Sequence, residues 1–282
     1  MRRIAGTLWS ILMLAAIHGM AQEFPRVSPK ASVSQVVGLT TITITYSRPG
    51  VKGRVIWGEL VPYEKVWRTG ANEATTFEVS DAVRINGHPL PAGKYALFTI
   101  PRPDRWTIIF NTKWNQWGAF DYNPDEDALR IDVRPERTDQ HREWMMFSFE
   151  NLTPTSADVV LHWEKLRVKF TVTVDVVPKV IGYCRKTLAH RKPDDWRTPL
   201  RCADFCMNHK AHLEEALRWI DDSIAVQENY FNLRVKAYLL AYLGRLAEAI
   251  AVGQRAVQLG RERGLETNDL EQRLRQWQKQ AQ

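Results

Sequence analysis

Apolar and polar residues alternate in short runs along the first part of the chain, and the period changes near Pro178. Residues 41–47 place Ile42, Ile44 and Tyr46 on one face and three threonines on the other, which is the period of a half-buried strand. Similar runs recur between turn signals, as in an all-β sandwich or barrel. The strands that we expect cover residues 33–37, 41–47, 75–80, 83–85, 94–100, 106–111, 128–134, 143–150, 158–163 and 168–176.

Turn signals indicate how these runs connect. Asn86-Gly87 is a strong tight-turn signal because both residues tolerate positive φ. Pro89 and Pro91 follow, and they keep the return segment irregular or at a sheet edge. About ten strands are enough for two packed sheets around a core. We therefore predict an antiparallel, jelly-roll-like β-sandwich over residues 22–177.

A helical period replaces the alternation after Pro178. Apolar stripes at this period include Leu213, Leu217, Ile220 and Ile224, and later Leu270, Leu274 and Trp277. Gly244 and its small neighbours are spaced similarly to a tetratricopeptide repeat, so we predict a tetratricopeptide-like array of helical hairpins over residues 178–282. Because two weak copies are fewer than such arrays use, we expect the helices to cover one another or the sandwich rather than to form a peptide groove.

The N-terminus has the pattern of a secretory signal. Arg2 and Arg3 precede an apolar run over residues 4–17, and small residues end at Ala21. This pattern predicts a signal peptide over residues 1–21 that is cleaved near Ala21. The run is shorter than the roughly 20 residues of a spanning helix, so we expect an exported, periplasmic protein without a transmembrane span.

The charge is positive but unevenly placed. The chain contains 39 basic and 32 acidic residues, a formal net charge of +7. Residues 22–177 carry 19 of each sign, so the excess outside the signal peptide lies in the helical part. A solvated helical surface is our main interpretation of that excess, and a contact face for an anionic surface is the alternative. A neutral β part in an exported chain argues against nucleic-acid binding.

Three cysteines are an odd number for an exported chain. Cys184 can pair with Cys202 or with Cys206, and the latter two share a face of a predicted helix. The interpretation that we favour is three buried, unreactive thiols. A metal site would need further ligands, which His209 alone does not supply.

The segment over residues 46–76 is the best candidate for a site, because Pro and Gly interrupt it too often for a regular element. Its candidate ligand-binding residues are Arg48, Arg54, Trp57, Trp67, Arg68 and Asn72. In one interpretation a tryptophan stacks on a ligand ring while an arginine binds a carboxylate or phosphate. In the other, which we favour, the tryptophans fill the core, and Arg68, Asn72 and Glu73 satisfy one another and the loop backbone.

A second aromatic segment, over residues 112–127, contains Trp114, Trp117 and Tyr122. These rings lie beside amide side chains and would suit an oligosaccharide, so Trp117 is a further candidate ligand-binding residue. The alternative, which we favour, is a loop that covers an edge of the sandwich with its own aromatic side chains.

Catalytic patterns are scarce in this chain. A glycosidase needs two carboxylates across a cleft, and Glu59 and Glu73 are the pair near the aromatic segment. The sequence has no histidine pair at metal-ligand spacing, no Gly-x-Ser-x-Gly elbow and no phosphate loop. We therefore expect no metal and no cofactor, and we favour a non-enzymatic role.

Motifs in the β part resemble those of a known family. They are Tyr46-Ser47-Arg48-Pro49, Lys52-Gly53-Arg54, Ile56-Trp57-Gly58, Leu60-Val61-Pro62-Tyr63, residues 66–76, Leu90-Pro91-Ala92-Gly93, residues 106–111, Gln116-Trp117-Gly118-Ala119 and Trp163-Glu164-Lys165. Over about residues 28–176 the chain resembles the domain-of-unknown-function family 2911, associated mainly with exported proteins of the Bacteroidetes. The helical tail is similar to that of many members, whereas Glu64-Lys65 and Trp114 depart from the family pattern. The resemblance implies export but supplies no reaction and no catalytic residue.

Taken together, these patterns predict a non-enzymatic module of the cell envelope that binds a ligand or a partner. The expected ligand is a glycan or an anionic small molecule, bound at the segment over residues 46–76. Two alternatives remain: a protein partner bound by the helical tail, and a hydrolase that acts on a glycan or envelope polymer with Glu59 and Glu73.

Overall fold

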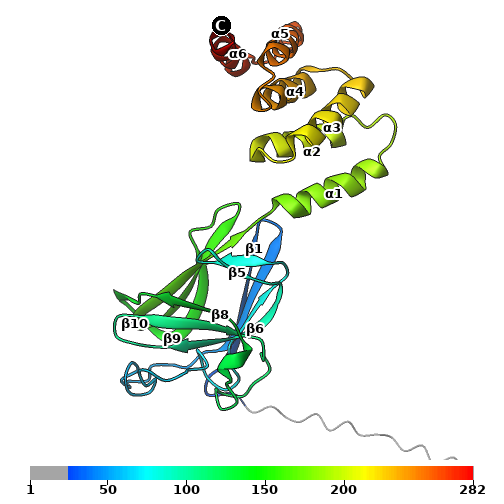
Figure 1. Ribbon diagram of the computed structural model, residues 1–282. Helices are drawn as coiled ribbons and strands as arrows, with labels where there is room; N and C mark the ends of the chain where they lie inside the picture. Colours follow the sequence, from blue (N-terminus) through cyan, green and yellow to red (C-terminus); the bar gives the residue numbers. More distant parts are fainter. Residues whose placement is uncertain (1–24, 282) are drawn as a thin grey trace, which may run out of the picture.

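The computed structural model describes residues 25–281. Two antiparallel sheets face each other, and helices follow them in the chain (Figure 1). The sequence-based prediction of an antiparallel sandwich followed by helices is therefore confirmed. The predicted signal peptide, residues 1–21, lies outside the described residues.

The larger sheet has the strand order β1-β2-β3-β6-β7-β8 and the smaller one has the order β5-β4-β10-β9. The strands are β1 Lys30–Val37, β2 Thr40–Ser47, β3 Thr76–Val79, β4 Val83–Ile85, β5 His88–Leu90, β6 Gly93–Ile100, β7 Trp106–Asn111, β8 Asp127–Val133, β9 Glu136–Glu150 and β10 Ser156–Val174, and a 3-10 helix, η1 Pro124–Glu126, precedes β8. β5 is an edge strand, as Pro89 within it and Pro91 directly after it predict.

The inner faces of the two sheets form one apolar core. Ile42 and Ile44 of β2 are fully buried, on the face that the alternating pattern predicts. The rings of Phe77, Phe110 and Phe170 meet edge to face across the two sheets, with centroids 5.1–5.9 Å apart. Such aromatic contacts add specific geometry to the burial of apolar area, so the core fixes how the two sheets face each other.

The hairpin of β9 and β10 differs from the prediction. The sequence predicts separate strands over residues 158–163 and 168–176, whereas β10 runs unbroken from Ser156 to Val174. Register shifts occur on both sides of Glu164, whose φ is 54°. This bulge absorbs the irregular residues while β10 stays paired with β9. The polar residues there therefore mark a bulge rather than the end of a strand.

The helices form a second core of their own. They are α1 Val177–Ala189, α2 Arg197–His209, α3 Leu213–Val226, α4 Tyr230–Tyr242, α5 Leu246–Glu262 and α6 Asn268–Gln280. α2 packs against α3 and α4 against α5. Gly244 has a φ of 78° and lies in the turn between α4 and α5, where the sequence places it. Within residues 25–281, every helix is too short or too polar to span a bilayer.

A disulfide joins α1 to α2. Cys184 and Cys202 are bonded, with their Cα atoms 5.8 Å apart, and Cys206 is a free, buried thiol. The favoured expectation of three free thiols is therefore wrong, because helix packing brings two of them within bonding reach. Burial raises the pKa of Cys206 to about 11, so this thiol is protonated at neutral pH and is a poor nucleophile.

The helices continue from one end of the sandwich through α1 (Figure 1). The ammonium group of Lys179 in α1 donates to the carbonyl of Leu39 at 3.0 Å and pairs with Asp81 at 2.8 Å. These contacts fasten the first turn of α1 to loops at that end of the sandwich.

Candidate functional site

The candidate site is the loop between β2 and β3, residues 48–75, at the end of the sandwich remote from the helices (Figure 1). Its first part contacts the smaller sheet, since the amide of Val51 donates to the carbonyl of Glu143 in β9 at 2.9 Å. Its middle contacts the larger sheet, since Trp67 and Thr99 of β6 exchange backbone hydrogen bonds of 2.8 and 2.9 Å. The loop therefore joins both sheets, and this fixes the directions of its side chains.

Four tryptophans close the core beneath this loop. Five ring pairs among Trp57, Trp67, Trp106 and Trp163 have centroids 5.0–6.2 Å apart. Trp106 and Trp163 are 1% exposed, whereas Trp57 and Trp67 are half-buried at the edge of the cluster. The two predicted ligand-binding tryptophans thus pack against the core, and Trp67 also faces a cavity.

This cavity has a volume of about 340 Å³, and we call it the arginine cavity. Its walls include Lys52, Arg54, Arg68 and Asn72, and none of the described residues that line it is acidic. The Nε of Arg68 is buried and has no hydrogen-bond partner among residues 25–281. Burial lowers the pKa of Arg68 from its ordinary value, because the guanidinium loses part of its hydration. The cavity therefore holds a cationic donor that lacks an acceptor.

Two other predicted arginines are held by backbone carbonyls. The Nε of Arg48 donates to Met145 in β9 at 2.8 Å. Arg54 donates to Val51 at 3.1 Å and to Gly50 at 2.6 Å. Arg48 thus fastens the loop to β9. Arg54 braces its own turn and also lines the arginine cavity.

The predicted mutual pairing of Arg68, Asn72 and Glu73 is wrong. Asn72 donates to the carbonyl of Ser28 at 3.2 Å, and Glu73 accepts hydrogen bonds from Arg26 at 2.7 and 2.8 Å. Both partners come from the segment before β1, which lies beside the loop only in the folded chain. With Asn72 and Glu73 occupied there, Arg68 is left facing the cavity.

The backbone around Arg68 adopts unusual angles. Thr69 has a φ of 55° and Asn72 a φ of 59°. Asn tolerates this left-handed region, but a β-branched residue there is an outlier. The hydroxyl of Thr75 donates to the carbonyl of Thr69 at 2.8 Å, which holds that conformation. Strain of this kind is concentrated at functional sites, so it supports the loop as the candidate site.

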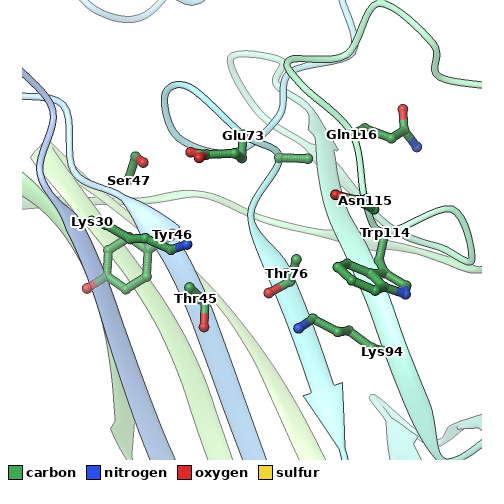
Figure 2. A pocket seen from close by; sticks show the side chains of 11 residues that line it. Lys30, Thr45, Tyr46, Ser47, Glu73, Thr76, Lys94, Trp114, Asn115 and Gln116 are labelled. Carbon is green, nitrogen blue, oxygen red and sulfur yellow. The ribbon is translucent and has the colours of Figure 1, made fainter. Parts of the chain in front are cut away.

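A second cavity of about 140 Å³ lies on the outer face of the larger sheet, and we call it the lysine cleft (Figure 2). It is lined by Lys30, Thr45, Tyr46, Ser47, Glu73, Ala74, Thr76, Lys94, Trp114, Asn115 and Gln116. The ammonium group of Lys94 lies 4.5 Å from the centre of the Trp114 ring, a cation–π contact. Burial opposes ionisation of Glu73, but hydrogen bonds and the charges of Arg26 and Lys30 hold its pKa below the usual value.

In the aromatic segment over residues 112–127, one ring packs against the larger sheet and three others are exposed to solvent. Tyr122 packs edge to face on Phe98 of β6 at 5.2 Å, so this part covers the outer face of the larger sheet rather than an edge of the sandwich. Trp114, Trp117 and Phe120 remain 42%, 58% and 84% exposed. Trp117 forms a backbone bridge with Glu73 but lines neither cavity.

The two candidate carboxylates do not share a cavity. Glu73 lines the lysine cleft, whereas Glu59 is exposed in a turn and lines neither of the two cavities. In the part of the chain that the structure describes, no group of three or more His, Cys, Asp or Glu side chains could hold a metal ion.

The ligand-binding residues predicted from the sequence omit three lysines that line the two cavities. Lys52 belongs to the quoted motif Lys52-Gly53-Arg54, so its place in the loop could have indicated it. Lys30 of β1 and Lys94 of β6 lie on outward faces of strands that are not neighbours in the sequence. Only the strand order of the sheet brings these two together.

Comparisons with known proteins give one positive result. Neither the search of curated proteins nor the search of solved structures found a match. A family model described as "Protein of unknown function (DUF2911)" matches residues 28–172, which contain nearly all of both cavities. The chain therefore belongs to this family of proteins of unknown function.

Proposed function

We propose that the β part is a non-enzymatic module that binds a small anionic molecule in the arginine cavity. The buried Nε of Arg68 carries this proposal, because it is a cationic donor without an acceptor. A buried donor without a hydrogen-bond partner lowers the stability of the folded protein by about 1–3 kcal/mol. An acceptor atom of a bound ligand would remove that cost.

The charges around Arg68 favour an anion over a neutral ligand. Lys52, Arg54 and Arg68 line one cavity without a lining carboxylate, so their potentials add there. Guanidinium groups bind carboxylate and phosphate in a planar, two-pronged geometry. The amide of Asn72 adds a neutral polar group at the same wall.

The rest of the wall indicates an apolar body for the ligand. Trp67, Leu60 and Val61 also line the cavity, and Val61 and Trp67 belong to the apolar core. Small-molecule sites usually have volumes of about 300–1,000 Å³ and combine apolar walls with a few polar anchors. An aryl or alkyl carboxylate or phosphate fits this combination.

The hydrolase alternative receives no support from the site. A glycosidase needs two carboxylates that face each other across a cleft. Because Glu59 and Glu73 do not line a common cavity, we do not propose a hydrolytic activity.

Export to the cell envelope is part of the proposal. The disulfide between Cys184 and Cys202 supports it, since such bonds persist in oxidising compartments. The helical tail stays a predicted contact surface for a protein partner, and its exposed Tyr183 beside Lys186 and Arg191 is where such a contact would form.

A thermal-shift experiment tests the proposal. Mature protein is titrated with benzoate, phenyl phosphate, octanoate and their uncharged amide or alcohol analogues. Binding to the folded state raises the apparent melting temperature. We expect a rise with at least one anion and none with its neutral analogue.

Two variants test whether the anion binds in the arginine cavity. Arg68→Met should abolish the ligand-induced rise, whereas Arg134→Met should keep it because Arg134 is an exposed arginine that lines neither cavity. A rise that persists unchanged in Arg68→Met, or equal rises with the anion and its neutral analogue, would show that the proposal is wrong.

A further inference from the structure

The lysine cleft has a chemistry different from that of the arginine cavity. Its floor is the outer face of four neighbouring strands, to which β1, β2, β3 and β6 contribute Lys30, Thr45, Thr76 and Lys94. Strands in a sheet lie about 4.7–4.9 Å apart, so this row extends over roughly 14 Å. The cleft is thus a polar groove that is longer than a single sugar ring.

Charged groups stand at both ends of this row. In Figure 2 the ammonium groups of Lys30 and Lys94 point toward the middle of the cleft from opposite sides. Lys94 is held by an ion pair with Glu78 at 3.4 Å, and both of these side chains are partly exposed. Exposed ion pairs are weak, so a ligand carboxylate can compete for Lys94.

The negative charge of Glu73 does not offset the positive charges of Lys30 and Lys94. Its carboxylate is already engaged by two hydrogen bonds from Arg26. The described ion pairs of residues 25–281 give Lys30 no partner. An anionic group that enters the cleft therefore meets two lysines and a carboxylate whose charge is already balanced by Arg26.

Trp114 supplies an aromatic surface at the cleft. The Lys94 ammonium lies against this ring at 4.5 Å, and the residue is 42% exposed. Its loop is fixed, because the amide of Ala74 donates to the carbonyl of Gln116 at 3.0 Å. Aromatic rings at a wet surface combine an apolar face with polar surroundings, and the C–H face of a pyranose ring is a partner of that kind.

We propose that the lysine cleft is a second binding site, specific for a short oligosaccharide that carries carboxylate groups. Trp114 stacks on a sugar ring, Lys30 and Lys94 bind carboxylates, and the hydroxyls of Thr45 and Thr76 bind sugar hydroxyls. This inference is independent of the proposed function, which concerns Arg68 and the other cavity. The chemistry favours a sugar acid over single-stranded nucleic acid, because the cleft offers several hydroxyl groups but one exposed aromatic ring, whereas single-stranded nucleic acids stack successive bases on several rings.

Isothermal titration calorimetry with tetragalacturonate tests this site, with the fully methyl-esterified tetramer as the matched uncharged probe. We expect the acid to bind mature protein and the ester to bind at least tenfold more weakly. Trp114→Ala should weaken binding of the acid roughly tenfold. Lys94→Gln should also weaken it, and the loss should shrink at high salt because the interaction is screened.

Control variants separate this inference from the proposed function. Phe120→Ala removes an exposed ring of the same loop that lines neither cavity, so it should bind the acid like the wild type. Arg68→Met should also bind it like the wild type, although it loses the ligand of the arginine cavity. Absence of binding by the acid, equal binding of the ester, unchanged affinity in Trp114→Ala, or tighter binding of a deoxythymidine tetranucleotide would each overturn the inference.

Discussion

Replacing Arg68 by methionine should stabilise the ligand-free protein, although arginine occupies this site naturally. The side chain buries its Nε beside the tryptophan cluster without a hydrogen-bond partner among residues 25–281. Methionine has a similar length, adapts to irregular space and carries no donor. The substitution therefore removes an unpaired donor and leaves few atoms unfilled.

The expected gain is about 1 kcal/mol in the free energy of unfolding. A buried donor without a partner costs about 1–3 kcal/mol. We take the lower end because Arg68 is only half-buried, so its guanidinium loses only part of its hydration on folding. For a chain of this size, such a gain raises the melting temperature by about 2–4 °C.

Urea unfolding followed by tryptophan fluorescence measures this effect, since four of the tryptophans cluster beneath the substituted loop. The midpoint should rise while the m-value stays constant, since the surface exposed on unfolding hardly changes. Asn72→Ala is the matched comparison in the same loop. It loses hydrogen bonds to Ser28 and Ser47 of 3.2 and 3.3 Å, so it should destabilise the protein by about 1 kcal/mol.

The two variants must therefore move in opposite directions. If Arg68→Met destabilises the protein as much as Asn72→Ala does, the guanidinium holds the loop together and the reasoning is refuted. If the gain is found, Arg68 has been kept at a cost to stability, as expected for a group that serves binding.

Two further predictions concern the disulfide and a buried histidine. Converting Cys184 and Cys202 together to alanine should destabilise the helical part by about 3 kcal/mol, from loop closure over a sequence separation of 18; an unchanged urea midpoint by circular dichroism at 222 nm would contradict this. Burial lowers the pKa of His162, so the unfolded chain binds its proton more tightly. His162 therefore stabilises the fold above the unfolded pKa of about 6.5, and this contribution is lost as the pH falls through the lower folded pKa. His162→Gln should flatten the pH dependence of the urea midpoint between pH 7 and pH 5, and a slope equal to that of the wild type would be the opposing result.

The candidate site could be predicted only in part from the sequence. The motif around Arg68 identified the loop, and the loop does line a cavity. The motif could not predict the hydrogen-bond partner of each side chain. Arg48 binds a carbonyl 97 residues away, and Glu73 binds Arg26 from the segment before β1. Such partners depend on how the chain folds back on itself.

The sequence by itself determined the β and α parts and the inner faces of the strands. Alternation and helical period follow from the directions of Cβ atoms along a strand or helix, which are local properties. Ile42, Ile44, Leu270 and Leu274 are buried as their periods indicate. Local geometry therefore sufficed for this level of the structure.

Only the tertiary structure decided which thiols pair and which charges meet. Cys202 and Cys206 are equivalent in spacing, but the packing of α1 on α2 selects Cys202 for Cys184. Strand order likewise brings Lys30 and Lys94 to one cleft and leaves Arg68 facing the other. These outcomes depend on contacts between distant segments, and the period of a single segment carries no information about them.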